Sequence, residues 1–392
     1  MRLSWNRRNF LKSALLAAGG LSSLNFQHAL AEEAVPDNWI SFRNGTANLG
    51  ISHTRLPAAL RLQWSHVTPD GTASTAVIDS GNVYMGTLSG DLHCFELKTG
   101  TLTWTYRSID KVEPNSFAPG FNAAAALDAR HIYLGDDQGT LHAVDRASGK
   151  KVWTVETDGE IVGGAQLFEN RVLFGSHDGH LYCHDAESGK QIWRAETHGP
   201  VNATPCLAGK FTFTTGCDQP ILRVFELESG RQEAEVPLRS LLIGAAAVRE
   251  EILYFGTGEG IVLALDWRNK KTLWEFSVPG REQQMQSSPA VTADCVIIGS
   301  RDKRVYCLER QTGQLRWEFA TRGKVDSSPV VVGDDVYFGS SDRNIYGVKI
   351  ADGQQIWKQP VKQSITGSPA IAAGCLVIGT ESANGQILCF GE

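Results

Sequence analysis

The segment SSPAVTADCVIIGSRDKRVYCLERQTGQLRWEF, residues 287–319, decides the fold. It contains four short runs typical of β-strands, at 287–292, 295–299, 304–308 and 315–319, and turn residues bound each run. Four such strands in one unit match the blade of a β-propeller.

The tryptophan near the end of this unit recurs along the chain. The equivalent residues in other units are Trp104, Trp153, Trp193, Trp274 and Trp357. Their spacing is about 40 residues, and two units separate Trp193 from Trp274. A Gly commonly precedes the Trp by four residues, as Gly189 precedes Trp193. A period of this size is typical of propellers and other repeat folds.

The first strand of each unit is built from small residues. The eight first strands begin near Ala73, Ala123, Gly163, Ala203, Gly244, Ser287, Ser327 and Gly367. Because the innermost strands of radially arranged sheets converge on one axis, only small side chains fit there. The count indicates eight units, and the crowding indicates a closed ring.

The eighth unit stops after a third strand, at 386–390, without a strand that carries Trp. Residues 60–66, which contain Trp64, precede the first unit and fit the pattern of the missing strand. We therefore predict an all-β, eight-bladed β-propeller over residues 60–392, with four antiparallel strands per blade. The N-terminal strand near Trp64 closes the last blade and removes an exposed sheet edge.

Two positions in the middle of the chain depart from the repeat. Ala234 stands where the fourth unit should have Trp, and Lys270 replaces the turn Gly of the fifth unit. We expect these two blades to pack less regularly than the others.

Residues 1–31 read as a targeting segment. Arg7 and Arg8, followed by an apolar stretch at 13–26, resemble a twin-arginine export signal, and Ala29-Leu30-Ala31 fits a signal-peptidase site. A stretch of about 14 residues is too short for a spanning helix, which needs about 20. The first cysteine, Cys94, is too distant for a lipid anchor. We expect a periplasmic or otherwise extracytoplasmic protein without a stable membrane anchor, and an N-terminal extension at 32–59.

The charge balance limits the class of partner. Lys and Arg number 37 against 43 Asp and Glu, a formal net charge of −6. Such a chain offers no basic face for nucleic acid or anionic lipid. We therefore expect a protein partner and no nucleic acid.

The run Ala143-Val144-Asp145 through Ser148-Gly149 to Trp153 resembles the tryptophan-docking repeat of pyrroloquinoline-quinone-type eight-bladed propellers. That family includes quinoprotein dehydrogenases and also the outer-membrane assembly lipoprotein BamB, which has the repeats but no quinone. The resemblance covers residues 60–392. The mature length places the chain closer to the BamB-like branch, although it lacks the lipidated cysteine.

Quinoprotein dehydrogenases typically stack their cofactor on a disulfide between adjacent cysteines and hold Ca²⁺ beside a catalytic Asp. Adjacent cysteines do not occur in this sequence. We predict no cofactor, and keep pyrroloquinoline quinone with Ca²⁺ as the alternative. The eight cysteines are interpreted as small core residues; Cys295 with Cys307, and Cys375 with Cys389, are the pairs that adjoining strands would allow to form disulfides.

Three histidines, His177, His180 and His184, cluster in the third unit and raise the question of a metal site. Two of them occupy a predicted hairpin tip, where exposed polar residues are expected. We predict no metal site and no catalytic residue.

The residue just before each small strand should reach one mouth of the axial channel. Six of these eight positions are polar, and we predict that they bind a ligand or partner: Thr72, Asn122, Asn202, Gln286, Asp326 and Thr366. The other two are Val162 and Ile243. A single carboxylate, without a base or metal beside it, is weak support for catalysis. The longer loops at 109–119 and 279–284 should rim one face.

The sequence thus predicts a monomeric, exported, non-catalytic propeller that serves as a protein-binding or scaffold module. The alternatives are a quinone-dependent oxidoreductase and a small-ligand sensor that uses the channel mouth.

Overall fold

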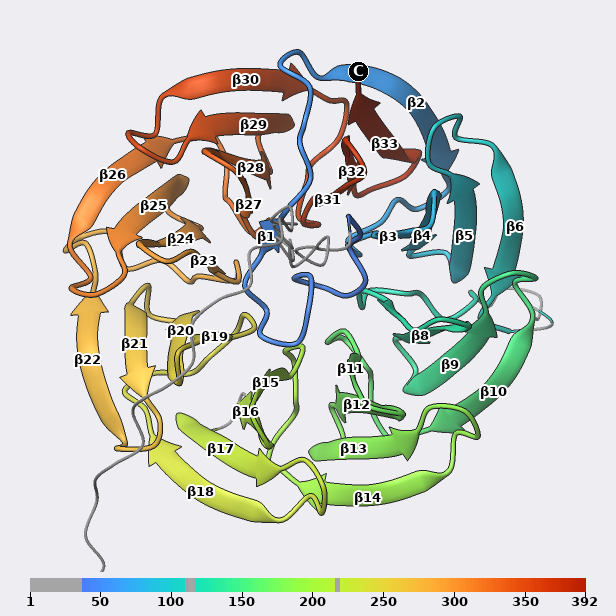
Figure 1. The fold of residues 1–392 in the computed structure, drawn as a ribbon, viewed down its shortest axis with the longest axis horizontal. Helices are drawn as coiled ribbons and strands as arrows, with labels where there is room; N and C mark the ends of the chain where they lie inside the picture. The colour runs from blue at the N-terminus through green and yellow to red at the C-terminus, as the bar shows by residue number, and fades with distance from the viewer. Residues whose placement is uncertain (1–36, 110, 112–116, 216–218) are drawn as a thin grey trace, which may run out of the picture. The chain divides into compact units, whose positions relative to one another are not determined.

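The computed structural model describes residues 37–392 except 110, 112–116 and 216–218. The predicted export signal at 1–31 therefore lies outside the described residues. The described residues form eight four-stranded antiparallel sheets arranged as blades of a ring around a common axis (Figure 1). Among them, no helix has the length and apolar character needed to cross a membrane. The predicted all-β, eight-bladed propeller is confirmed.

The blades are numbered in chain order, from innermost to outermost strand. Blade 1 is β3 (Val77–Asp79), β4 (Asn82–Gly86), β5 (Asp91–Glu96) and β6 (Leu102–Arg107). Blade 2 is β7 (Ala126–Leu127), β8 (His131–Gly135), β9 (Thr140–Asp145) and β10 (Lys151–Glu156). Blade 3 is β11 (Gln166–Phe168), β12 (Arg171–Ser176), β13 (His180–Asp185) and β14 (Gln191–Glu196). Blade 4 is β15 (Cys206–Ala208), β16 (Phe211–Thr215), β17 (Ile221–Glu226) and β18 (Gln232–Pro237).

Blades 5 to 8 repeat this order. Blade 5 is β19 (Ala247–Arg249), β20 (Ile252–Gly256), β21 (Val262–Asp266) and β22 (Lys271–Phe276). Blade 6 is β23 (Ala290–Val291), β24 (Cys295–Ser300), β25 (Arg304–Glu309) and β26 (Leu315–Ala320). Blade 7 is β27 (Val330–Val332), β28 (Asp335–Ser340), β29 (Asn344–Lys349) and β30 (Gln355–Pro360), with β1 (Ile51–Ser52) added parallel to β27. Blade 8 is β31 (Ala370–Ala372), β32 (Cys375–Gly379), β33 (Gly385–Gly391) and β2 (Arg61–Thr68).

The two ends of the described chain meet in blade 8. Strand β2 pairs antiparallel with β33, from Arg61 opposite Gly391 to Thr68 opposite Gly385. The N-terminal strand near Trp64 therefore supplies the outer strand of the last blade, as predicted. This pairing leaves no unpaired outer edge on β33 and joins the ring into a closed circle (Figure 1).

The innermost strands are shorter than the sequence pattern predicts. The run expected at 287–292 contains only the two-residue strand β23. Pro289 has no N–H to donate, and the N–H of Ser288 bonds to Ser328 Oγ of the next blade at 2.9 Å instead of to its own sheet. The small residues before β23 therefore link blades rather than extend a strand.

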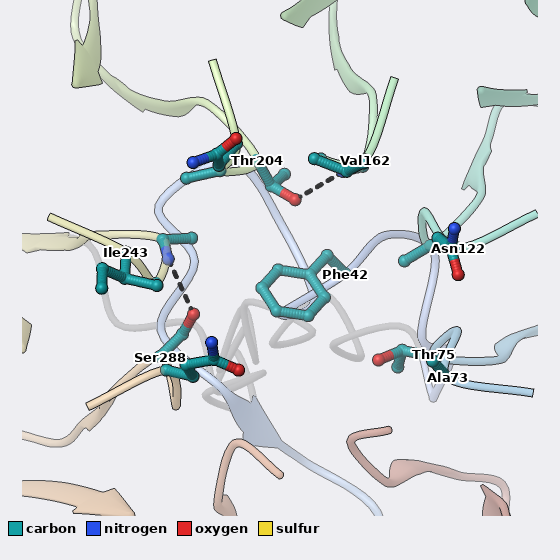
Figure 2. A pocket seen from close by; sticks show the side chains of 16 residues that line it. Phe42, Ala73, Thr75, Asn122, Val162, Thr204, Ile243 and Ser288 are labelled. Carbon is teal, nitrogen blue, oxygen red and sulfur yellow. Dashed lines mark hydrogen bonds between the residues drawn. The ribbon is translucent and has the colours of Figure 1, made fainter. Parts of the chain in front are cut away.

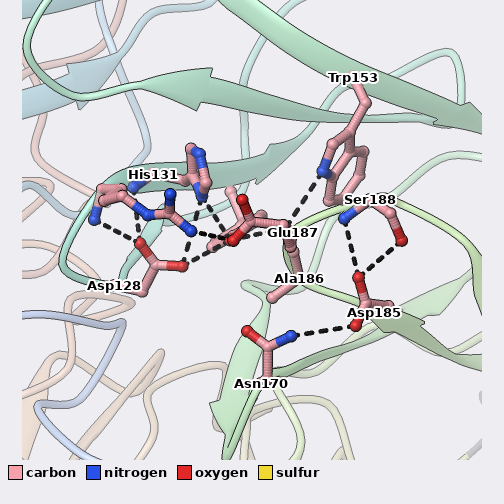
Figure 3. A network of polar contacts seen from close by, with 10 residues as sticks. Asp128, His131, Trp153, Asn170, Asp185, Ala186, Glu187 and Ser188 are labelled. Carbon is pink, nitrogen blue, oxygen red and sulfur yellow. Dashed lines mark hydrogen bonds and ion pairs between the residues drawn. The ribbon is translucent and has the colours of Figure 1, made fainter.

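A tryptophan dock joins one blade to the next. In Figure 3, Trp153 of β10 lies against the turn of blade 3 and donates its Nε1–H to the Ala186 carbonyl at 3.1 Å. A Cβ placed on Gly189 would lie 2.6 Å from the Trp153 ring, so only glycine fits above the indole. Asp185 holds this turn in shape, since Oδ1 accepts from the Ser188 N–H at 2.8 Å and from its hydroxyl at 2.6 Å.

The same dock occurs at six of the eight joints between blades. The Trp–Gly pairs are Trp64–Gly100, Trp104–Gly149, Trp153–Gly189, Trp193–Gly230, Trp274–Gly313 and Trp317–Gly353. Each of these indoles donates its Nε1–H to a backbone carbonyl of the following blade, at 2.7–3.1 Å. At the joint of blades 7 and 8, Trp357 packs edge-on against Phe390 with 5.4 Å between ring centroids.

The two positions that depart from the repeat, Ala234 and Lys270, lie at the same joint, between blades 4 and 5, where the Trp–Gly dock is absent. Ala234 of blade 4 has no indole to place on the turn of blade 5, so Lys270 can occupy that turn with φ of 53°. Trp267 fills the joint from the other side: its ring lies 5.2 Å from that of Phe211 and 5.1 Å from that of Phe213. This joint is therefore built differently but is still aromatic.

Residues 37–54, here called the hub segment, run around the axis of the ring and bond to every blade. Trp39 forms a β-bridge to Ile78 of blade 1. Farther along, carbonyls of the segment accept five backbone N–H groups of the innermost strands at 2.8–3.0 Å, from Leu127, Leu207, Val248, Val291 and Val331. Gln166 of blade 3 donates to the Gly45 carbonyl, and the Gly374 N–H of blade 8 donates to Thr54 Oγ1. The N-terminal extension expected at 32–59 is thus in large part a component of the propeller.

A buried arginine anchors the hub segment. Arg43 is fully buried, and its guanidinium donates to the carbonyls of Ser328 and Pro329. Burial lowers its pKa to about 9. A Cβ on Gly50 would lie 1.9 Å from Arg43 Nη2, so the absence of a side chain at residue 50 makes room for the guanidinium.

The Trp dock predicts that replacing a docking glycine by alanine destabilises the fold more than the same substitution at a glycine with free space around it. Gly313→Ala and Gly333→Ala both place alanine at a positive φ, 71° and 56°, but only the Cβ of residue 313 meets an indole, at 2.5 Å. We expect Gly313→Ala to lower the free energy of unfolding by about 1–3 kcal/mol more than Gly333→Ala does. Urea unfolding of both variants measures the difference, and equal losses would contradict the dock.

The hub segment predicts a second matched pair. Gly50→Ala would displace the Arg43 guanidinium from its carbonyl partners, whereas Gly45→Ala, also at a positive φ, meets nothing within 4 Å. We expect Gly50→Ala to lower the free energy of unfolding by about 2 kcal/mol more than Gly45→Ala does, because the buried guanidinium of Arg43 would lose its hydrogen bonds. Thermal unfolding compares the variants, and limited proteolysis should cut Gly50→Ala first near its N-terminus. Indistinguishable behaviour of the two would show that Arg43 does not anchor the segment.

Candidate functional site

An axial cavity lies at the centre of the ring, with a volume of about 140 Å³. Its walls are residues that lie just before the innermost strands of blades 1 to 6, and Phe42 of the hub segment projects into its middle (Figure 2). The hydrophobic ring of Phe42 therefore occupies space that an open channel would leave to solvent.

Three of the six predicted binding residues line this cavity: Asn122, Asn202 and Gln286. The two apolar residues at equivalent positions, Val162 and Ile243, line it as well. These five come from five different blades, so the structure brings them together as the ring geometry requires. Figure 2 shows Asn122 among the side chains that line the cavity.

The other three predicted residues do not line the axial cavity. Thr72 is fully buried, and its hydroxyl donates to the Gly86 carbonyl at 2.7 Å. Thr366 bonds through its hydroxyl to Glu381. Asp326 makes a two-pronged ion pair with Arg301, at 2.8 and 3.0 Å. Each of these polar groups is thus already satisfied by a neighbour in the chain.

Hydroxyl groups on the innermost segments connect blade to blade. Ser288 Oγ accepts the Ala245 N–H at 2.9 Å, and Ser368 Oγ accepts the Ser328 N–H at 2.9 Å. Thr204 Oγ1 accepts the Gly164 N–H at 2.8 Å, a contact drawn in Figure 2. The small residues at the hub therefore allow the innermost segments to pack closely, and their hydroxyls also form hydrogen bonds that link neighbouring blades.

The chemistry open to the cavity is limited by its lining. None of the residues that line it is charged. A cavity of about 140 Å³ is also below the range of about 300–1,000 Å³ that is usual for ligand and cofactor sites. Amides and hydroxyls can bind water or a small neutral molecule, but they provide no general base and no nucleophile with a base beside it.

The residues at the hub do not fit a quinone with Ca²⁺. A hard cation needs several carboxylate and carbonyl oxygens, and the one carboxylate at the mouth positions, Asp326, has both oxygens committed to Arg301. Within residues 37–392, gaps aside, no three His, Cys, Asp or Glu side chains converge as metal ligands. His184 uses Nδ1 to contact the Gly189 carbonyl at 2.9 Å, and His180 contacts its neighbour Asp178 at 3.2 Å.

A second, larger hollow opens on the surface between blades 8 and 1. Its volume is about 550 Å³, and we call it the seam pocket. It is lined by Arg55–Pro57, Gln63, Leu97, Lys98, Ala373–Cys375, Gly391 and Glu392. Sequence reasoning missed this pocket because its walls come from segments more than 250 residues apart that meet only when the ring closes.

Other residues of the axial site were also missed. Phe42 belongs to a segment outside the repeat, so periodicity gives no signal for it. Arg301 could have been suspected, because it follows the Gly-Ser pair at the end of β24, where most other units have no basic residue. Its pairing with Asp326 crosses from blade 6 to the start of blade 7 and depends on the fold.

A family model described as "Outer membrane protein assembly factor BamB" matches this chain at residues 112–173, 137–288 and 259–389. These matches together span more than half of the sequence. No curated protein sequence matches the chain.

Solved structures share the fold at low sequence identity. BamB from Moraxella catarrhalis is 18% identical, with a TM-score of 0.70 over 85% of this chain and all of its own. Quinohemoprotein alcohol dehydrogenase from Comamonas testosteroni is 13% identical, with a TM-score of 0.78 over 91% of this chain and 80% of its own. A europium-containing methanol dehydrogenase is 12% identical, with a TM-score of 0.77 over 92% of this chain and 99% of its own. At these identities the likeness shows the propeller architecture and leaves function to the residues of the site.

Proposed function

This chain belongs to the PQQ-type repeat propeller family of the outer membrane protein assembly factor BamB, and from that premise we propose that it is an exported, non-catalytic propeller that binds a protein partner. The observation that carries the proposal is the filled hub. The hub segment bonds to all eight blades, Phe42 enters the axial cavity, and what is left of the cavity is small and uncharged. The outer surface is then the part of the molecule available for recognition.

The quinone-dependent alternative has less support from the residues. Structural neighbours include quinone-dependent dehydrogenases, but the axial cavity offers no free carboxylate for Ca²⁺ and the sequence has no adjacent cysteines. The small-ligand alternative has a specific basis in Asn122, Asn202 and Gln286, whose amides face one cavity. The volume of that cavity restricts such a ligand to a few atoms.

The loops beside the channel mouth are the surface we propose for the partner. Phe117, in the connection from β6 to β7, is 88% exposed, the most exposed large hydrophobic side chain among the described residues. The residues that follow it are anchored, since the Phe121 N–H donates to the Thr87 carbonyl at 2.9 Å and the Asp137 N–H donates to the Gly120 carbonyl at 3.0 Å. An exposed aromatic ring next to an anchored segment is the kind of residue that contributes strongly to protein interfaces.

We further propose that the protein acts outside the cytoplasm as a monomer, exported by the twin-arginine route through residues 1–31. The support is the Arg7-Arg8 pair followed by an apolar stretch, and the membership of the BamB family. The six residues of the predicted mouth, Thr72, Asn122, Asn202, Gln286, Asp326 and Thr366, remain part of the proposed face. In this proposal three of them line the cavity and three stabilise its rim.

The partner surface is tested by a matched pair of serine substitutions. Phe117→Ser removes the exposed ring of the connection from β6 to β7, and Leu273→Ser removes a 46% exposed side chain on the outer strand β22. After affinity purification of the exported protein from its native host, we expect a stoichiometric protein partner with wild type and with Leu273→Ser. Its recovery should fall about tenfold with Phe117→Ser, because a central aromatic residue contributes about 1.4 kcal/mol or more. Equal recovery from both variants, or no partner at all, would count against this surface.

The cofactor alternative is tested on the purified protein by adding pyrroloquinoline quinone and Ca²⁺ and removing the excess. We expect no stoichiometric quinone absorbance and no dye-linked oxidation of alcohols or sugars. The axial cavity, which Phe42 partly fills, is too small for the quinone, and its uncharged lining has no carboxylate for Ca²⁺. Stoichiometric quinone with dye reduction would replace the proposed function with the oxidoreductase alternative.

A further inference from the structure

Two cysteines of blade 8 meet at the wall of the seam pocket. Cys375 is the first residue of β32, lines the pocket and is partly exposed. Cys389 of β33 is fully buried behind it, and its sulfur lies 3.9 Å from the carbonyl of Leu97, another residue of the pocket wall. Cys375 thus borders the pocket, and Cys389 is covered by protein.

The strand register brings the two sulfurs together. Leu376 pairs with Phe390 and Val377 with Cys389, so Cys375 at the end of this ladder is a diagonal neighbour of Cys389 on the same face of the sheet. A Cβ on Gly391 would lie 3.4 Å from the Cys375 sulfur, so this sulfur packs against the end of β33. Pairing of β32 with β33 stops at Leu376, Cys375 still pairs with Ala372 of β31, and the turn between them has a positive φ at Ala373 and Gly374. A disulfide between these diagonal positions requires a local shift of the backbone at this hairpin.

The surroundings divide the two thiols into different roles. The neighbouring Cys389 thiol and the Lys98 charge lower the pKa of Cys375, against burial and the Asp37 carboxylate, which raise it. The proximity of Cys375 and burial raise the pKa of Cys389. The partly exposed sulfur of Cys375 is therefore the better nucleophile at neutral pH. Arg55 and Lys98 place positive charge in the pocket lining and Glu392 places negative charge there, which suits a reagent that carries both carboxylate and ammonium groups.

Blade 6 contains a diagonal cysteine pair at the same positions, but there both cysteines are buried. Cys295 and Cys307 occupy the equivalent diagonal positions of β24 and β25. There, however, Arg316 Nη1 donates to the Cys295 sulfur at 2.8 Å, and Cys295 is only 2% exposed.

Cys295 is covered and Cys375 is accessible because two neighbouring residues differ between blades 6 and 8. Arg316 precedes the Trp of its outer strand and pairs with Glu309, whose backbone lies opposite Cys295. In blade 8, the residue before Trp64 is Gln63, and Gly391 stands where Glu309 would be. Without the Arg and Glu side chains, the surface hollows into the seam pocket and the cysteine becomes accessible.

We propose that Cys375 and Cys389 form a redox-active pair that exchanges with a low-molecular-weight disulfide bound in the seam pocket. The Cys375 thiolate attacks one sulfur of that disulfide, forms a mixed disulfide and releases one thiolate. The Cys389 thiol loses its proton to solvent and attacks the Cys375 sulfur, which forms the intrachain disulfide and releases the second thiolate. Two thiols of the protein are oxidised and one external disulfide is reduced to two thiols, so atoms and electrons balance.

The test uses oxidised glutathione, a disulfide that carries carboxylates, on the folded wild-type protein. Peptide mapping by mass spectrometry after alkylation of the remaining thiols identifies the products. We expect a linked peptide that joins Cys375 to Cys389, and Cys295 and Cys307 still alkylated as free thiols after unfolding. In Cys389→Ser, the mixed disulfide with glutathione should accumulate on Cys375, at least about tenfold faster than any adduct on Cys295.

Two further variants give the controls. Cys375→Ser should abolish glutathione addition to Cys389, because the buried sulfur has no access of its own, whereas Cys307→Ser should leave the reaction of Cys375 unchanged. The proposal is overturned if wild type keeps both thiols of blade 8 free, if Cys295 reacts as fast as Cys375, or if Cys389 is modified equally fast in Cys375→Ser. Should a variant fail to fold, the peptide map of the wild type decides between these outcomes alone.

Discussion

At six of the eight joints, one blade is held to the next by an indole that packs against a glycine, and the ring depends on the repetition of that contact. The Trp supplies a large apolar surface and one N–H donor, and the Gly supplies the missing Cβ, so neither residue is useful without the other. The joint of blades 4 and 5, which lacks the Trp, shows that the Gly is needed only where the Trp is present. Where Ala234 replaces the Trp, the turn tolerates Lys270 at a positive φ, and Trp267 restores an aromatic contact with Phe211 and Phe213.

A ring of eight blades leaves a gap at its axis, and this chain fills the gap with its own N-terminal residues. The hub segment uses backbone carbonyls, which match the N–H groups that the innermost strands direct inward. Arg43 and Asn48 add side-chain bonds to carbonyls of the blades, with Asn48 Nδ2 at 3.2 Å from the Thr204 carbonyl and 3.3 Å from that of Ala246. In consequence, the position at which a ligand would be expected in an open channel is occupied by protein, and the seam and loop surfaces become the places of chemical interest.

The sequence was sufficient for the architecture because the features that build it recur. The spacing of the tryptophans and the small first strands predicted eight blades, and the isolated strand around Trp64 predicted the closure that β2 and β33 form. The candidate site was predicted in part: Asn122, Asn202 and Gln286 line one cavity because ring symmetry brings equivalent positions together. Features that occur once could not be found this way. The hub segment has no repeat partner, and the pairing of Asp326 with Arg301 depends on how two neighbouring blades are placed.

The central claim is that residues 37–54 are an integral part of the hub, and amide hydrogen exchange tests it most directly. Peptides that cover this segment should exchange more slowly than exposed loops, because its own N–H groups are bonded: Trp39 donates to the Ile78 carbonyl, Gly50 to the Arg43 carbonyl and Asn48 to the Gly45 carbonyl. The innermost-strand N–H groups that donate to carbonyls of the segment, those of Leu127, Leu207, Val248, Val291 and Val331, should be protected with it. Slow exchange of both sides of this interface is the predicted result. Exchange of the segment at the rate of an exposed loop, with the rest of the propeller protected, would contradict the account.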